Sequence, residues 1–172
     1  DWVRKAKYLG HTAIGICDYN TMGATLNLQK ECSAAGLKHV FGYSFRLRHG
    51  DETVEMKLYC QTPNGLRNLL RIQKAVMVDS EEHTLTLRQL TDHAGGNVLV
   101  FGKRSGDWLR RNPDVVRKLK TAIGKEEGCS GKLYFQIDLT EYKAERIDVE
   151  VLKSVACYFE NFADPFTFSF EI

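Results

Sequence analysis

Hydrophobic positions along the chain follow two alternating patterns, one with helical spacing and one of short apolar runs rich in β-branched residues. The helical spacing predicts helices over residues 2–9, 22–35, 66–77, 87–93, 113–124 and 147–158. The short runs predict strands over residues 12–17, 37–41, 43–48, 53–61, 98–101, 133–137 and 165–172. This alternation indicates an α/β protein with a mostly parallel sheet covered by helices.

Glycine, proline and polar residues mark the boundaries of these elements. Gly36 follows a helical segment, as glycine does at helix C-termini, and residues 49–52 separate two strand patterns as a hairpin loop does. Residues 112–114 have the sequence of a helix N-cap with proline at the first helical position. The runs 12–17 and 37–41 lack polar alternation, so both are predicted to be strands buried on both faces.

Composition narrows the class of protein. The length of 172 residues suits one domain, and 43% hydrophobic with 27% charged residues is ordinary for a soluble globular protein. No run approaches the roughly 20 apolar residues of a membrane helix. The five cysteines are scattered without a C-x-x-C pair, which favours a reducing, cytoplasmic location over a disulfide framework. Because the chain opens within a helical pattern, we expect a fragment of a longer protein.

Charge is distributed unevenly along the chain. From Lys103 to Lys125 there are eight basic and two acidic residues, whereas residues 126–172 hold ten acidic and four basic ones. A basic segment of this kind either forms solvated helix faces or attracts DNA or an acidic partner. The candidate basic patch comprises Lys103, Arg104, Arg110, Arg111, Arg117, Lys118 and Lys120.

In α/β proteins the reactive residues lie at the carboxyl ends of strands, so these positions are the first candidates for chemistry. Such candidates are Asp18, Tyr19, Ser44, Glu55, Lys103 and Glu171. Carboxylate oxygens of Asp18 and Glu55 suit a hard cation such as Mg²⁺. Tyr19 binds a metal only after losing a proton from a group of pKa about 10, and the ammonium of Lys103 repels any dication.

Several segments occur in an order that matches a known family. They are Arg4–Ile14, Cys17–Asn20, Met22–Ala24, Lys38–Gly42, Asn64–Leu70, Phe101–Asp107 and Tyr134–Gln136. In this order they resemble the PHP domain of bacterial DNA polymerase III alpha subunits. The resemblance implies a distorted (β/α)7 barrel that lacks its first strand in this chain. It also implies that residues 1–172 form a single PHP-like domain of a longer polymerase-type protein.

Metal-ligand positions implied by the resemblance are mostly altered. Family members with an intact site bind up to three divalent metals through His, Asp, Glu and Cys side chains at the barrel mouth. Asp18 matches the family, but Tyr19 stands at a histidine position and Ser44 at a glutamate position. Glu55 aligns with a histidine and Lys103 with a cysteine. These departures predict a largely dismantled metal site.

The last of these remnant positions is Glu171, which falls near the final Asp-x-His of the family. A catalytic metal needs at least three protein ligands, so we expect no cofactor here. The alternative is a weakly bound Zn²⁺, Mn²⁺ or Mg²⁺. An ion pair of Lys103 with Asp18 or Glu55 is the replacement we favour for the lost metals; the alternative is that Lys103 points to solvent.

Three functional hypotheses follow. The first is a degenerate PHP domain that serves as a scaffold in DNA replication, without phosphoesterase activity of its own. The resemblance implies that its partners are replisome proteins and the rest of a polymerase III alpha-type chain, a DNA-directed DNA polymerase and thus a transferase. The second is an active metal-dependent PHP phosphoesterase or 3′–5′ exonuclease. The third is a stand-alone nucleic-acid- or protein-binding module that uses the basic patch.

Overall fold

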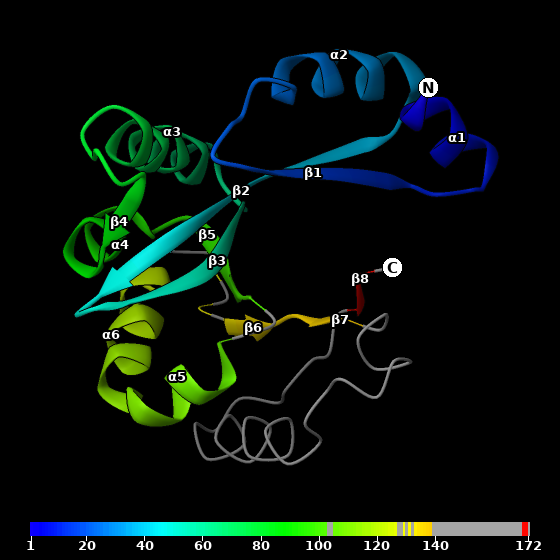
Figure 1. The fold of residues 1–172 in the computed structure, drawn as a ribbon. Coiled ribbons are helices and arrows are strands. Elements are labelled where there is room, and N and C mark those ends of the chain that lie inside the picture. Colours follow the sequence, from blue (N-terminus) through cyan, green and yellow to red (C-terminus); the bar gives the residue numbers. More distant parts are fainter. Residues whose placement is uncertain (103–104, 127–128, 130, 132, 139–169, 172) are drawn as a thin grey trace.

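A computed structural model describes residues 1–102, 105–126, 129, 131, 133–138 and 170–171 of the chain (Figure 1). Its helices are α1 (Trp2–Tyr8), α2 (Thr25–Ala35), α3 (Pro63–Met77), α4 (Leu87–His93), α5 (Gly106–Arg111) and α6 (Pro113–Ile123). Its strands are β1 (Ala13–Tyr19), β2 (Lys38–His49), β3 (Glu52–Cys60), β4 (Thr84–Thr86), β5 (Asn97–Phe101), β6 (Leu133–Phe135), β7 (Ile137–Asp138) and β8 (Phe170–Glu171). The predicted helix 147–158 and most of the predicted strand 165–172 lie outside the described residues.

A mixed six-stranded sheet organises the described chain. Its strands follow the order β1-β2-β3-β5-β6, with β4 pairing with β2, while β7 and β8 form a separate parallel pair. The prediction of an α/β fold is confirmed. The sheet is less parallel than predicted, because the hairpin of β2 and β3 lies in its middle and makes the β2–β3 and β3–β5 pairs antiparallel. The β1–β2, β2–β4 and β5–β6 pairs are parallel.

Strand β2 is one continuous strand where the sequence predicts two. Gly42 separates the predicted strands 37–41 and 43–48, yet it pairs in register with Cys17 on one side and Tyr59 on the other. A Cβ atom at Gly42 would lie 2.7 Å from the Tyr59 ring and 2.9 Å from the Cys17 sulfur. Glycine is therefore needed here because two neighbouring side chains close over the strand, and it marks no strand end.

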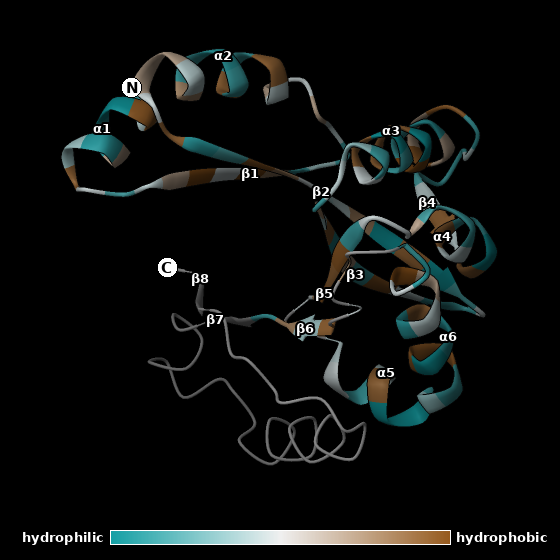
Figure 2. Ribbon diagram, turned by 180° about the vertical axis from the view of Figure 1, so that it is seen from behind, coloured by the Kyte–Doolittle hydropathy of each residue, from teal (hydrophilic) through white to brown (hydrophobic). Residues whose placement is uncertain are grey.

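Strand β1 lies at an edge of this sheet and pairs with β2 alone among the described strands. None of its residues is buried, and Val40 in the first part of β2 is 38% exposed. The prediction that residues 12–17 and 37–41 are buried on both faces is therefore wrong. Helices α1 and α2 lie together on one side of β1 (Figure 1), and hydrophobic and hydrophilic residues are mixed along both helices (Figure 2).

The hydrophobic core lies between the second half of β2, its neighbouring strands and helices α3, α4 and α6. Along β2, Tyr43, Phe45 and Leu47 are fully buried, whereas Arg46 and Arg48 are exposed. This alternation follows from the two-residue period of a strand. Further fully buried core residues are Met56, Leu58, Leu69, Ile72, Leu90, Leu99, Phe101, Leu119 and Ile123. No helix in the described part of the chain is long and apolar enough to cross a membrane.

Two short elements were not predicted, and one predicted cap is absent. Strand β4 has three residues and helix α5 has six, which is too short to give a periodic pattern. Asn112 does not cap α6, because its side-chain amide donates to the Trp108 carbonyl at 2.8 Å instead. Trp108 is itself buried, with its ring edge-on to His49 at 5.7 Å between centroids. The backbone carbonyl of Trp108 thus engages the side chain that the sequence assigns to the helix start.

Helix α3 begins at Pro63, three residues earlier than predicted, because Thr62 caps it. The Thr62 hydroxyl accepts from the Gly65 amide at 3.0 Å. Further along α3, the Asn68 side chain donates to the Gly95 carbonyl at 2.9 Å, which fastens the loop before β5 to the helix. From the other side, the Glu126 carboxylate accepts from the Thr62 hydroxyl at 2.7 Å. The start of α3 is thus a junction of three segments distant in sequence.

Stability of this junction is expected to depend on pH through Glu126. Hydrogen bonds from Asn64 and Thr62 hold the pKa of Glu126 below its ordinary value, because they favour the charged carboxylate. Its contribution is therefore complete above the ordinary glutamate pKa and is lost as the pH falls through the lowered pKa of the folded state. Glu126→Gln should lower the urea midpoint at neutral pH, and the gap to the parent protein should narrow on acidification.

The control for this prediction is Glu81→Gln, at an exposed position. It should leave the urea midpoint unchanged at neutral pH, where exposed substitutions have little effect. A Glu126→Gln midpoint that differs from that of the parent protein by the same amount at every pH would show that the charge of Glu126 does not contribute.

Candidate functional site

Strand register gathers three of the predicted remnant positions on one face of the sheet. Tyr19 at the end of β1 lies beside Ser44, and Ser44 lies opposite Lys57 of β3. Two residues further along β2, Arg46 lies opposite Glu55. Because side chains alternate between the two faces along each strand, these five side chains point to the same face. We call this set of five the polar face.

Asp18, by contrast, is not part of the polar face. It precedes Tyr19 by one residue and has Tyr43 as its register partner, so both point to the opposite, core-facing side. Tyr43 is fully buried, and its hydroxyl has no hydrogen-bond partner among the described residues. Burial, with a smaller contribution from Tyr19, raises the pKa of Tyr43 to about 12. Tyr43 therefore stays protonated at neutral pH and offers no anionic oxygen to a cation.

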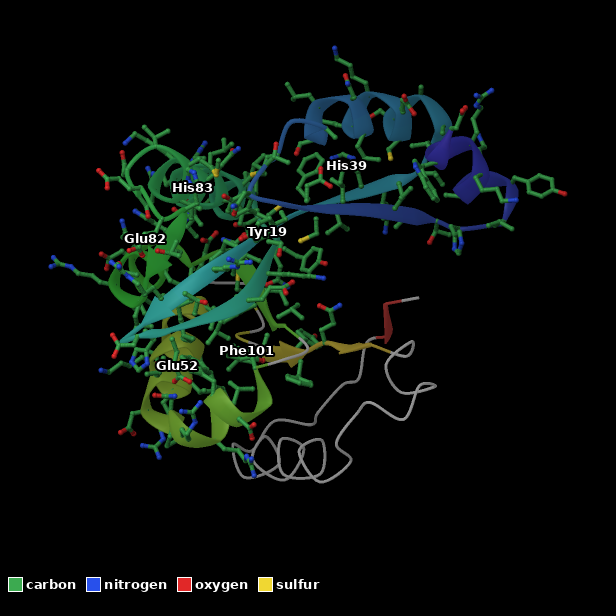
Figure 3. The ribbon with its side chains drawn as sticks, viewed as in Figure 1. Tyr19, His39, Glu52, Glu82, His83 and Phe101 are labelled. Atoms are coloured by element: carbon green, nitrogen blue, oxygen red, sulfur yellow. The ribbon has the colours of Figure 1, made fainter. Side chains whose placement is uncertain are left out.

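Positive charge occupies the polar face. The Arg46 guanidinium lies over the Tyr19 ring, with its carbon 5.7 Å from the ring centroid, a cation–π arrangement. Tyr19 lies where β1 meets β2, near the middle of the molecule, and is 48% exposed (Figure 3). Lys57 adds a second cationic side chain, and Ser44 is buried between the neighbouring strands. Glu55 is the single carboxylate of the five.

The end of β5 approaches the polar face at Glu55. The Gly102 amide donates to the Glu55 carbonyl at 2.9 Å, and a Cβ atom at Gly102 would lie 2.8 Å from that oxygen. Only glycine fits such a close backbone approach. Lys103 follows Gly102 but lies outside the described residues, so its ion pair with Asp18 or Glu55 stays a prediction. Glu171 lies in β8, with Asp138 as its register partner.

The side chains of the polar face do not fit a divalent metal. A catalytic ion takes three or more protein ligands, usually imidazole, thiolate or carboxylate. The polar face supplies one carboxylate, one hydroxyl and one phenol together with two cations, which repel a dication. Across the described residues as a whole, no group of three or more His, Cys, Asp or Glu side chains could hold a metal ion.

Sequence reasoning missed Arg46 and Lys57. Arg46 could have been found from the two-residue alternation along a strand, since it comes two positions after Ser44 on the same face. The position of Lys57 opposite Ser44 depends on the hairpin register, which is set by the loop that joins β2 to β3. Two cationic side chains beside Tyr19, Ser44 and Glu55 are a signal that strand ends alone do not give.

The predicted basic patch is only partly a free cationic surface. Arg110 pairs with Asp107, Arg111 with Glu52 at 2.7 Å, and Arg117 with Asp114 at 2.8 Å, all at exposed positions. Two further members, Lys103 and Arg104, lie outside the described residues. Exposed pairs of this kind contribute little to stability, but they reduce the positive charge that a ligand would meet.

Comparison with known proteins agrees with the resemblance seen in the sequence. The sequence model of the PHP domain family matches residues 1–129, well over half of the chain, and the chain therefore belongs to the PHP domain family. Among curated proteins, the DNA polymerase III subunit alpha of Staphylococcus aureus (strain COL) is 26% identical over 121 residues. The subunit alpha of Staphylococcus epidermidis (strain ATCC 12228 / FDA PCI 1200) is 30% identical over 80 residues.

These relatives are much longer than the chain. The match covers 70% of this chain but 11% of the Staphylococcus aureus protein, and 46% of this chain but 8% of the Staphylococcus epidermidis protein. Among solved structures, a putative metal-dependent phosphoesterase from Bifidobacterium adolescentis aligns with a TM-score of 0.46 and 14% identity, covering 91% of this chain and 77% of that one. Such a TM-score is too low to carry an argument about function.

Proposed function

We propose that this chain is a PHP domain that has lost its metal site and serves as a scaffold and interaction domain of a DNA polymerase III alpha-type protein. In this role it takes part in DNA replication in the cytoplasm without cleaving phosphoesters itself. The observation that carries the proposal is the position of Arg46, whose guanidinium lies over Tyr19 at the altered histidine position. A fixed positive charge there opposes a bound dication and takes over part of its electrostatic role.

Exposed apolar side chains support the interaction role. Trp2 and Tyr8 on α1 are 82% and 83% exposed, and Leu26 on α2 is 68% exposed. Large apolar side chains that are this exposed are typical of sites covered by another protein segment. The partners proposed for this surface are the remainder of a polymerase-type chain and proteins of the replisome.

Metal analysis of the purified chain tests the proposal. We expect substoichiometric Zn, Mn, Fe and Mg after dialysis, and no release of phosphate or 3′ nucleotides from phosphoester substrates with added Mn²⁺. Glu55→Gln, which removes the one carboxylate of the polar face, should change neither result. One or more tightly bound ions per chain, together with phosphoesterase activity that Glu55→Gln abolishes, would establish the active enzyme instead and refute the scaffold.

A further inference from the structure

A cleft of about 370 Å³ is lined by residues of α4 and α6. These two helices lie side by side (Figure 1). The lining residues of the cleft are Thr91 of α4, four residues of α6 and the lysine that follows α6: Thr91, Arg117, Lys118, Thr121, Ala122 and Lys125. Three of the six are cationic and none is acidic. Two of the cations belong to the basic patch, whereas Lys125 was not assigned to it.

Positive charge in this cleft is largely available to a ligand. Lys118 and Lys125 are exposed, and neither is in an ion pair with any described residue. Arg117 pairs with Asp114 at 2.8 Å, but both side chains are more than half exposed, so this pair is weak. The cleft therefore presents two unpaired ammonium groups and a guanidinium that can exchange its partner.

The hydroxyl groups of the cleft are already used within the helices. Thr91 donates to the Arg88 carbonyl at 2.9 Å, and Thr121 donates to the Arg117 carbonyl at 3.0 Å. Recognition in the cleft thus comes from charge, with few directional donors. None of the six described lining residues is aromatic, so they supply no platform on which a base could stack.

We propose that this cleft binds the phosphate groups of a nucleic-acid backbone, independently of base sequence. Ammonium groups on flexible stems act as point charges and suit phosphates whose position varies along a strand. A pocket selective for one small phosphate ester needs convergent, fixed donors, and the engaged threonine hydroxyls do not supply them. The site depends neither on the polar face nor on a metal, so it is independent of the proposed scaffold role.

The test is anisotropy of a fluorescein-labelled oligothymidylate of about 20 nucleotides, titrated with the full chain at several salt concentrations. Three phosphate contacts predict a slope of log K against log salt of about −2, from roughly −0.7 per contact for single strands. The double substitution Lys118→Glu with Lys125→Glu should weaken binding by about 10-fold or more and flatten this slope. Since both positions are exposed, the urea midpoint should not change.

The matched control is Lys30→Glu with Lys38→Glu, at exposed positions of α2 and β2. It changes the net charge by the same amount and should leave binding within about twofold of the parent protein. Equal losses in both variants would show attraction to net charge alone and overturn the proposal. So would the absence of oligothymidylate binding by the parent protein at about 50 mM salt.

Discussion

Replacing Gly65 by alanine is expected to destabilise the domain by about 3 kcal/mol, at the upper end of what overpacking costs. A Cβ atom at this position would lie 2.0 Å from the Gly96 carbonyl oxygen and 2.6 Å from its carbon, and backbone atoms cannot rotate away. In an open helical position the same change stabilises a protein by up to about 1 kcal/mol. The sign of the effect on the urea unfolding midpoint therefore reports the close contact between α3 and the loop before β5.

Gly23→Ala is the matched control for this substitution. The nearest atom to a Cβ there is the Thr21 hydroxyl oxygen at 3.5 Å, an ordinary contact distance, and the position is exposed. Its effect should stay within about 0.5 kcal/mol. A Gly65→Ala variant as stable as Gly23→Ala would mean that α3 does not approach Gly96 as closely as described.

This contact also explains one of the segments behind the family resemblance. Within residues 64–70, Gly65 admits the Gly96 carbonyl, and Asn68 donates to the Gly95 carbonyl. Asn64 donates to Glu126 at 2.8 Å. The segment thus holds α3, the loop before β5 and the residues after α6 together, which is a structural role. Its presence indicates the fold and says nothing about activity.

The second large effect is expected at Phe45, with its neighbour Arg46 as an internal comparison. Phe45 is fully buried and stacks on Tyr43 at 6.0 Å between ring centroids, so Phe45→Ala leaves a cavity and should cost about 3–5 kcal/mol. Arg46 follows it on the exposed polar face, and Arg46→Ala should cost less than about 1 kcal/mol. Urea midpoints of both variants measure this asymmetry between the two faces of β2.

Similar losses at the two positions would contradict the assignment of faces. If Arg46→Ala were as damaging as Phe45→Ala, the polar face would have to be packed against something that the described residues do not include. That result would also weaken the case for Arg46 as a replacement for a metal, since the packing of its side chain would then matter more than its charge.

Strong periodicity made most of the fold predictable. The structure places α3, α6 and the hairpin of β2 and β3 close to the predicted segments 66–77, 113–124 and 43–61. Each of these segments is long enough for its hydrophobic periodicity to be recognised. Short elements such as β4 were missed because three residues hold no period. The prediction that β1 is buried was wrong for a different reason. An apolar run indicates a preference for strand, but whether that strand is central or at an edge depends on the strands that pair with it.

Some residues of the polar face could be predicted from the sequence, but the side chains that surround them could be predicted less well. Tyr19, Ser44 and Glu55 come from three separate strands, and register places them on one face. Only Tyr19 ends its strand as predicted, because β2 continues to His49 and Glu55 lies inside β3. Asp18 points to the other face, because it is the residue next to Tyr19 and successive side chains of a strand point to opposite faces. The place of Lys57 opposite Ser44 depends on the pairing of β2 with β3, which a list of strand ends does not contain.

Strand β2 also determines which part of the molecule can unfold locally. Its first part joins the α1-β1-α2 layer to the sheet, and its second part runs through the core. Of residues 1–40, Met22 alone belongs to the core cluster as described. Opening of this layer is therefore expected to expose little core surface and to take less free energy than global unfolding. Amide protons of β1 should then exchange through a local opening that leaves the remaining strands paired. Tyr19 thus lies at the end of an edge strand that is expected to open before the core does.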